Sequence, residues 1–166
     1  MLKFNHPNYK NNKLNESLFE ILKNNTLLSL STVTPNGNAY INTAFYAFDN
    51  KLRIYIITDP KSNHSKNLVK NQSIAISIFD SHFEFWKDKL KGVQLFGKGY
   101  KTPILQMHSA TYCFIKRFPL FKELVKNPKD FMKKTVKVSL YTLEIDRIKL
   151  FDETRFGEEN FIELRL

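Results

Sequence analysis

Cysteine is almost absent from this chain, and Cys113 is the only one among 166 residues. A lone thiol cannot form an intramolecular disulfide or a thiolate cluster for zinc. The four histidines show no paired ligand spacing, so we expect no metal site. Because nothing in the sequence requires an oxidising compartment, we expect a cytoplasmic protein.

Long hydrophobic runs are also missing. Residues 1–25 lack the apolar segment that a signal peptide needs, and no later stretch approaches the roughly 18 apolar residues of a membrane-spanning helix. We therefore expect neither secretion nor membrane insertion.

Acidic residues are few beside basic ones, with 16 Asp and Glu against 26 Lys and Arg. The resulting formal charge of +10 favours anionic partners such as phosphate esters or nucleic acid. Much of this charge is scattered lysine, which is typical of a solvated surface. A nucleic-acid-binding barrel, in which single strands stack on aromatic side chains beside lysines, is therefore only a secondary hypothesis.

Aromatic residues are plentiful, and 15 Phe and 7 Tyr favour strands over an all-helical bundle. Alternating or β-branched segments bounded by turn residues predict six strands, which do not alternate with helices as βαβ units do. The fold predicted for the single domain 1–166 is mainly β (α+β): a six-stranded antiparallel split β-barrel with an N-terminal helix and a helical insertion before the last strand. Residues 1–13 are expected to be irregular. The predicted strands are 26–34, 39–48, 51–58, 73–79, 92–100 and 137–151, with helices near 14–22 and 65–70 and within 103–134.

The order of several motifs resembles the FMN-binding split-barrel superfamily, which is typified by pyridoxamine 5′-phosphate oxidase. They comprise a turn at Asn36-Gly37, a third strand that ends in Thr58, and the Ser62-Asn63-His64 loop before a short helix, although Gln72 stands where proline is common. The later segments 91–99, 115–119 and 143–152 are similar to the YhbP-like branch of that superfamily.

The resemblance implies an FMN-dependent oxidoreductase that acts on a small molecule, in a homodimer with FMN at the subunit interface. Hydride would pass to or from flavin N5, and the flavin would need no side-chain nucleophile, so no catalytic residue is predicted. The backbone of Asn42, Thr43, Ala44 and Phe45 would contact the isoalloxazine ring and ribityl chain. The other implied cofactor-binding residues are Thr58 through its hydroxyl, Ser62, Asn63, His64 and Lys66 around the phosphate, and Gln94, often from across the dimer.

Each implied contact has a structural alternative. Ser62 or Asn63 could simply cap the following helix while Lys66 lies in solvent. Residues 42–45 could form an ordinary barrel strand, and Gln94 could point outward. Asn63 and His64 also stand where many relatives carry Arg and Lys, which lowers the expected affinity for phosphate.

Two further expectations remain open. The aromatic cluster His82, Phe83, Phe85 and Trp86, with the tail 155–157, could close over a flavin, although such clusters more often lie in a core or a dimer interface. The barrel could also be a non-catalytic module that binds flavin or haem, with His64, His82 or His108 as possible iron ligands.

Overall fold

Seven strands and five helices make up the described part of the chain in this computed structural model, which covers residues 12–82, 84, 86–124 and 137–166. The strands are β1 (Leu27–Val33), β2 (Ala39–Phe48), β3 (Ile54–Thr58), β4 (Ser73–Phe79), β5 (Lys91–Lys101), β6 (Ser139–Asp152) and β7 (Phe161–Arg165). The helices are α1 (Asn12–Asn24), α2 (Asn63–Lys70), α3 (Ile104–Arg117), α4 (Phe121–Leu124) and α5 (Glu153–Phe156). The predicted helix thus begins at Asn12, two residues inside the segment expected to be irregular.

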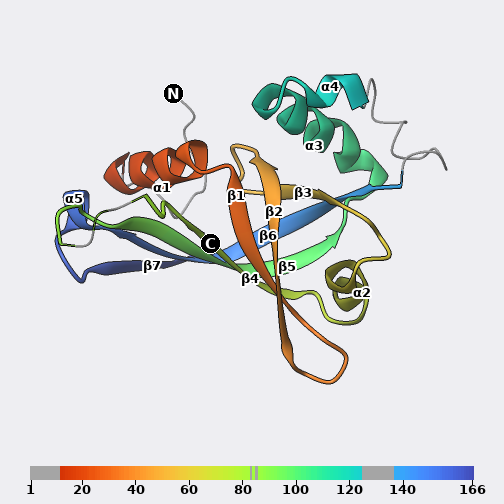
Figure 1. Cartoon of the computed structure of the whole chain (residues 1–166), viewed down its shortest axis with the longest axis horizontal. Helices are drawn as coiled ribbons and strands as arrows, with labels where there is room; N and C mark the ends of the chain where they lie inside the picture. Colours follow the sequence, from red (N-terminus) through yellow and green to blue (C-terminus); the bar gives the residue numbers. More distant parts are fainter. Residues whose placement is uncertain (1–11, 83, 85, 125–136) are drawn as a thin grey trace.

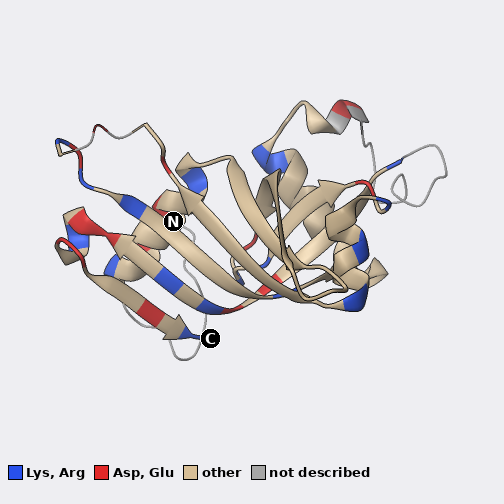
Figure 2. Cartoon of the chain, turned by 60° about the horizontal axis from the view of Figure 1, so that its bottom comes forward, with Lys and Arg blue, Asp and Glu red and all other residues tan. Residues whose placement is uncertain are grey.

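All strand pairs are antiparallel, and the order is β3-β2-β1-β4-β5-β6-β7 with an additional β3–β6 pairing (Figure 1). The β3–β6 ladder joins the ends of the first six strands into a closed barrel. The predicted six-stranded antiparallel barrel is therefore confirmed. Figure 2 shows lysine and arginine spread over several strands and helices rather than gathered on one patch.

Strand β6 pairs with two different strands along the same edge. Its first residues pair with β3, from Ser139 to Leu143, and its last residues pair with β7, from Arg147 to Phe151. The β5–β6 register shifts between Phe96 and Gly97, close to this change of partner. A Cβ on Gly97 would lie 1.9 Å from the Glu144 carbonyl oxygen, so only glycine fits this approach. Strand β7 was not predicted from the sequence.

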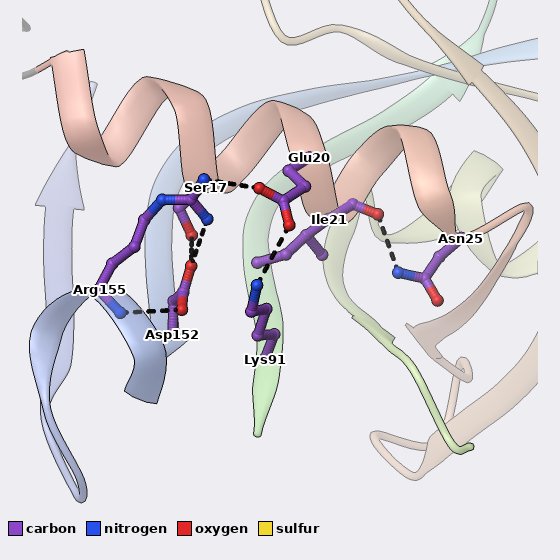
Figure 3. Close-up of polar contacts among 7 residues, drawn as sticks. All are labelled: Ser17, Glu20, Ile21, Asn25, Lys91, Asp152 and Arg155. Atoms are coloured by element: carbon purple, nitrogen blue, oxygen red, sulfur yellow. Dashed lines mark hydrogen bonds and ion pairs between the residues drawn. The ribbon is translucent and has the colours of Figure 1, made fainter. Parts of the chain in front are cut away.

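Helix α1 packs its apolar face into the main core, where Leu18 and Leu22 are fully buried with the inward-facing side chains of the barrel. Polar contacts on the side of α1 that faces the strands also join it to the end of β6 (Figure 3). Ser17 Oγ donates to the buried Asp152 carboxylate at 2.7 Å, and Arg155 bridges Asp152 and Glu20 at 2.8 and 2.6 Å.

Helix α3 covers the outside of the barrel at β2, β3 and β6 and forms a second core there. Ala47, Tyr55 and Leu140 of the barrel pack against Met107 and Phe114 of the helix. This helix lies within the region 103–134 in which helices were predicted. Its Leu105 and Tyr112 side chains are exposed, at 94% and 60%.

Candidate functional site

A pocket of about 520 Å³ opens where β2 and β3 separate. The β2–β3 ladder joins Tyr46–Phe48 to Ile54–Ile56, and β3 then continues beside β6 through Thr58. Residues 42–45 pair with β1 on one side only. Their other backbone edge, on the side of β3, has no partner strand, because the β2–β3 ladder begins only at Tyr46. The N–H and C=O groups of that edge are therefore available to a ligand. The lining residues are Asn42, Thr43, Ala44, Phe45, Ile57, Thr58, His64, Phe114, Phe118, Leu120 and Phe121.

The pocket gathers six of the ten predicted cofactor-binding residues from three separate elements. These are Asn42, Thr43, Ala44 and Phe45 on β2, Thr58 at the end of β3, and His64 in the first turn of α2. Two strands and one helix, which follow one another along the chain, therefore converge on a single cavity.

Aromatic side chains from α3 and α4 form the opposite wall. The Phe118 ring meets Phe45 edge-on with centroids 5.7 Å apart, and Phe114 lies 6.0 Å from Phe118 and 5.5 Å from Phe121. The sequence analysis did not identify these three residues as site residues. Phe114 lies on α3, Phe118 is its C-cap residue and Phe121 begins α4, so the position of this wall depends on how the two helices pack.

His64 is held by hydroxyl groups at the polar end of the pocket. Its Nε2 lies 2.6 Å from Thr58 Oγ1 and 3.0 Å from Ser62 Oγ. Ser62 Oγ donates to Ser65 Oγ, and Ser65 Oγ donates to the carbonyl of Asp59, both at 2.9 Å. Because Ser62 uses its only hydroxyl proton on Ser65, the contact with His64 needs the proton on Nε2. The hydroxyl proton of Thr58 then remains available to a ligand.

Burial lowers the pKa of His64 below its ordinary value. The lowered pKa favours the neutral ring near pH 7 in the ligand-free protein, and a negative charge placed beside the ring would favour its protonation.

Asn42, which is among the residues that line this pocket, carries an unsatisfied polar atom. Its Oδ1 is buried and has no hydrogen-bond partner among the described residues. A buried amide oxygen without a donor is costly, and a ligand N–H could satisfy it. The pocket thus combines an apolar wall, a free strand edge, an unsatisfied amide and a hydroxyl–imidazole cluster.

The sequence model of pyridoxamine 5′-phosphate oxidase matches residues 14–136, which include every strand and helix that lines this pocket. The chain belongs to this family. Two UPF0306 proteins of Campylobacter jejuni are 37% identical over 83 residues, which is 49% of this chain. The chain spans only 58% of the length of these curated relatives.

Solved structures show the same fold at low identity. A heme-binding protein from Mycobacterium smegmatis superposes with a TM-score of 0.72 at 14% identity, covering 95% of this chain and 59% of that one. The heme storage protein HutZ from Vibrio cholerae gives 0.65 at 16% identity, covering 84% and 94%. This barrel therefore also occurs in proteins that are described as heme-binding and heme storage proteins.

The other four predicted site residues do not line the pocket. Ser62 is the N-cap of α2, and its side chain accepts from Ser65 N, so the capping alternative is confirmed for Ser62. Asn63 and Lys66 are exposed. Gln94 is half-buried on the outer face of β5, between the inward-facing Val93 and Leu95.

The aromatic cluster and the tail lie away from this lining. His82 is exposed and contacts Asp80, and Trp86 is 89% exposed, while Phe83 and Phe85 fall outside the described residues. Arg155 and Phe156 pack beside the α1 end of the main core. Within the described ranges, no group of three potential metal ligands comes together and no helix has the length and apolarity to span a bilayer.

Proposed function

We propose that this pyridoxamine 5′-phosphate oxidase family member is a cytoplasmic FMN-binding protein, and that it acts as an oxidoreductase on a small molecule. The observation that carries the proposal is the free edge of β2 at residues 42–45, which faces an apolar wall and ends at Thr58 and His64. A planar, hydrogen-bonding ring with a phosphorylated side chain matches this combination.

The residues present fit the parts of FMN to different degrees. The β2 edge and Asn42 would bind the polar rim of the ring system, with the Phe118 side as an apolar wall. The first turn of α2, with its free N–H groups, and His64 would hold the phosphate. Bound FMN would supply the electron-transfer chemistry, while the protein would orient it and control access.

Dimerisation would bring Gln94 to the same site. Outward-facing residues form one row across the sheet, in which Thr43 pairs with Ser29, Ser29 with Ser77, and Ser77 with Gln94. Three strand spacings separate the ends of this row by about 14 Å, too far for Gln94 to reach the pocket of its own protomer. A two-fold axis along the strands between β1 and β4 would place the Gln94 side chain of a second copy opposite Thr43. The serines between them would allow close approach.

Haem is the second candidate, because two of the solved structures are described as a heme-binding and a heme storage protein. The three candidate iron ligands give it less support. His64 Nε2 contacts two hydroxyl groups, His82 is exposed beside Asp80, and His108 lines a different pocket. An iron site would need His64 to leave its hydrogen bonds, whereas a flavin site would not.

Absorption spectroscopy of the freshly purified protein, followed by titration with FMN and riboflavin, tests the proposal. We expect flavin bands or micromolar binding of added FMN, and weaker binding of riboflavin because it lacks the phosphate. The variant Asn42→Asp should weaken both ligands by placing a negative charge in the pocket, while His82→Ala serves as a matched exposed control. Absence of FMN binding would refute the proposal, and a Soret band would favour haem.

Anaerobic mixing with NADH or NADPH separates an enzyme from a flavin carrier. Bleaching of the flavin absorbance supports the oxidoreductase. Colour that persists with every donor would instead support a non-catalytic flavin-binding module.

A further inference from the structure

A second pocket, of about 600 Å³, lies on the other side of α3 from the pocket between β2 and β3. It is lined by the C-terminal end of α1, the residues at the end of β2, and the exposed face of α3. Its volume is in the range of small-molecule sites. We call it the α3 pocket, and its residues play no part in the proposed flavin site.

Arg117 stands at the edge of this pocket as a half-buried cation, and it has no acidic partner among the residues that the structure describes. Its Nη2 donates to the carbonyls of Leu22 and Asn25 at the end of α1, and its guanidinium lies 4.6 Å from the Tyr46 ring centroid and 5.1 Å from that of Phe48. Nε is buried and has no hydrogen-bond partner among the described residues. Burial lowers the pKa of Arg117, which indicates that its charge is incompletely compensated.

Positively charged side chains outnumber carboxylates in the lining of the α3 pocket. Lys23 and Lys116 line it with Arg117, and none of the ion pairs found within the described ranges includes any of these three cations. Asp49 is the only carboxylate in the lining, and it is already occupied. Its Oδ2 accepts from Arg53 Nε at 2.7 Å and from the Tyr55 hydroxyl at 2.9 Å, and its Oδ1 accepts from backbone N–H groups.

Apolar surface accompanies this positive charge. Phe48 and the 60%-exposed Tyr112 contribute rings to the lining. From the uncompensated cations, the saturated carboxylate and the rings, we propose that the α3 pocket binds a small aromatic anion, its acidic group facing Lys23, Lys116 and Arg117. The ligand would supply the missing counter-charge and cover the exposed rings.

Two probes with the same rings test this assignment: 1-anilinonaphthalene-8-sulfonate, which is anionic, and N-phenyl-1-naphthylamine, which is neutral. We expect saturable binding of the sulfonate. Lys23→Gln or Lys116→Gln should each weaken this binding about fivefold, which is the effect expected from the loss of one partly exposed charge contact. The double variant should weaken it further. Neutral-probe binding should not change. Lys70→Gln is the matched control, because Lys70 is also an exposed lysine in the last turn of a helix.

The affinity for the sulfonate should be the same with and without saturating FMN, since the two pockets are separate. It should also be unchanged if the protein proves to bind no FMN. Wild-type sulfonate affinity in the double variant would overturn the proposal. Displacement of the sulfonate by FMN would also overturn it, because the two ligands would then share one site. Loss of FMN binding alone would refute only the flavin proposal.

Discussion

His64 offers the most direct test of the proposed FMN site. Its ring is neutral without ligand because burial lowers its pKa, and its Nε2 is engaged by hydroxyl groups. A bound phosphate would favour the protonated ring and raise that pKa. Binding and protonation are therefore coupled at this position.

We predict that the affinity for FMN weakens as pH rises through the bound-state pKa of His64. Between the lowered free-state pKa and the raised bound-state pKa, binding takes up a proton, so affinity changes by up to about tenfold per pH unit. Titrations of wild type and His64→Gln across this window check it, since their ratio cancels the titration of the phosphate itself. Riboflavin is the control and should show no such dependence. A constant wild-type to variant ratio would exclude His64 as a phosphate ligand.

Residues whose positions are determined by strand ends lie together in one pocket, and their binding of a cofactor stays a prediction. Residues 42–45 and Thr58 meet because both strands were bounded by recognisable turns. Ser62 shows the limit, since a serine before a helix has the same pattern whether it caps the helix or binds phosphate. Phe118 was missed because its position depends on how α3 packs, which the neighbouring Pro119 does not reveal.

At the scale of elements, the junction of α1 with β6 and α5 is a buried polar cluster (Figure 3). Burial raises the pKa of Asp152, but hydrogen bonds from Arg155 and Ser17 outweigh it and hold the pKa below 3.8. The folded protein thus favours the ionised carboxylate more than the unfolded chain does. The stability that this contributes is fully present above about pH 4 and is lost as pH falls through the folded-state pKa.

We predict that Ser17→Ala lowers the free energy of unfolding by about 1.5–3 kcal/mol at pH 7, because it removes a hydrogen bond to a buried carboxylate. The exposed Ser109→Ala should change it by less than about 0.5 kcal/mol. Urea unfolding measures both. The stability difference between wild type and Asp152→Asn should also shrink as pH falls below 4. If it were the same at pH 7 and pH 3, the ionised cluster would not stabilise the α1 junction.

Elements were easier to predict from the sequence than the surfaces they bury. The strand spans were close to those observed. The face that α3 buries was not predicted, and the helix packs Met107 and Phe114 against the barrel while Leu105 and Tyr112 are exposed. Helical spacing identifies a helix but does not decide which face meets the barrel when several faces carry apolar residues. Strand β7 was missed because only five residues alternate, and its pairing depends on the part of β6 that β3 leaves free.

At the scale of the whole molecule, closure of the barrel positions two half-sites. The split at β2 and β3 carries the pocket, while Gln94 lies three strands away on the outer face. In the proposed two-fold arrangement, each pocket takes Gln94 from the other copy, so neither protomer holds a complete site.

Mixed dimers of Asn42→Asp and Gln94→Ala test this arrangement. Each variant alone should bind FMN poorly, because both of its sites are damaged. In a mixed dimer, one site carries both substitutions and the other carries neither. Random reassortment makes about half of the dimers mixed, so FMN binding should recover to about a quarter of a site per chain. If each site were built from one protomer, every site would keep one substitution and mixing would restore nothing. Measuring FMN bound per chain before and after reassortment, with the mass in solution, therefore decides whether the site is shared.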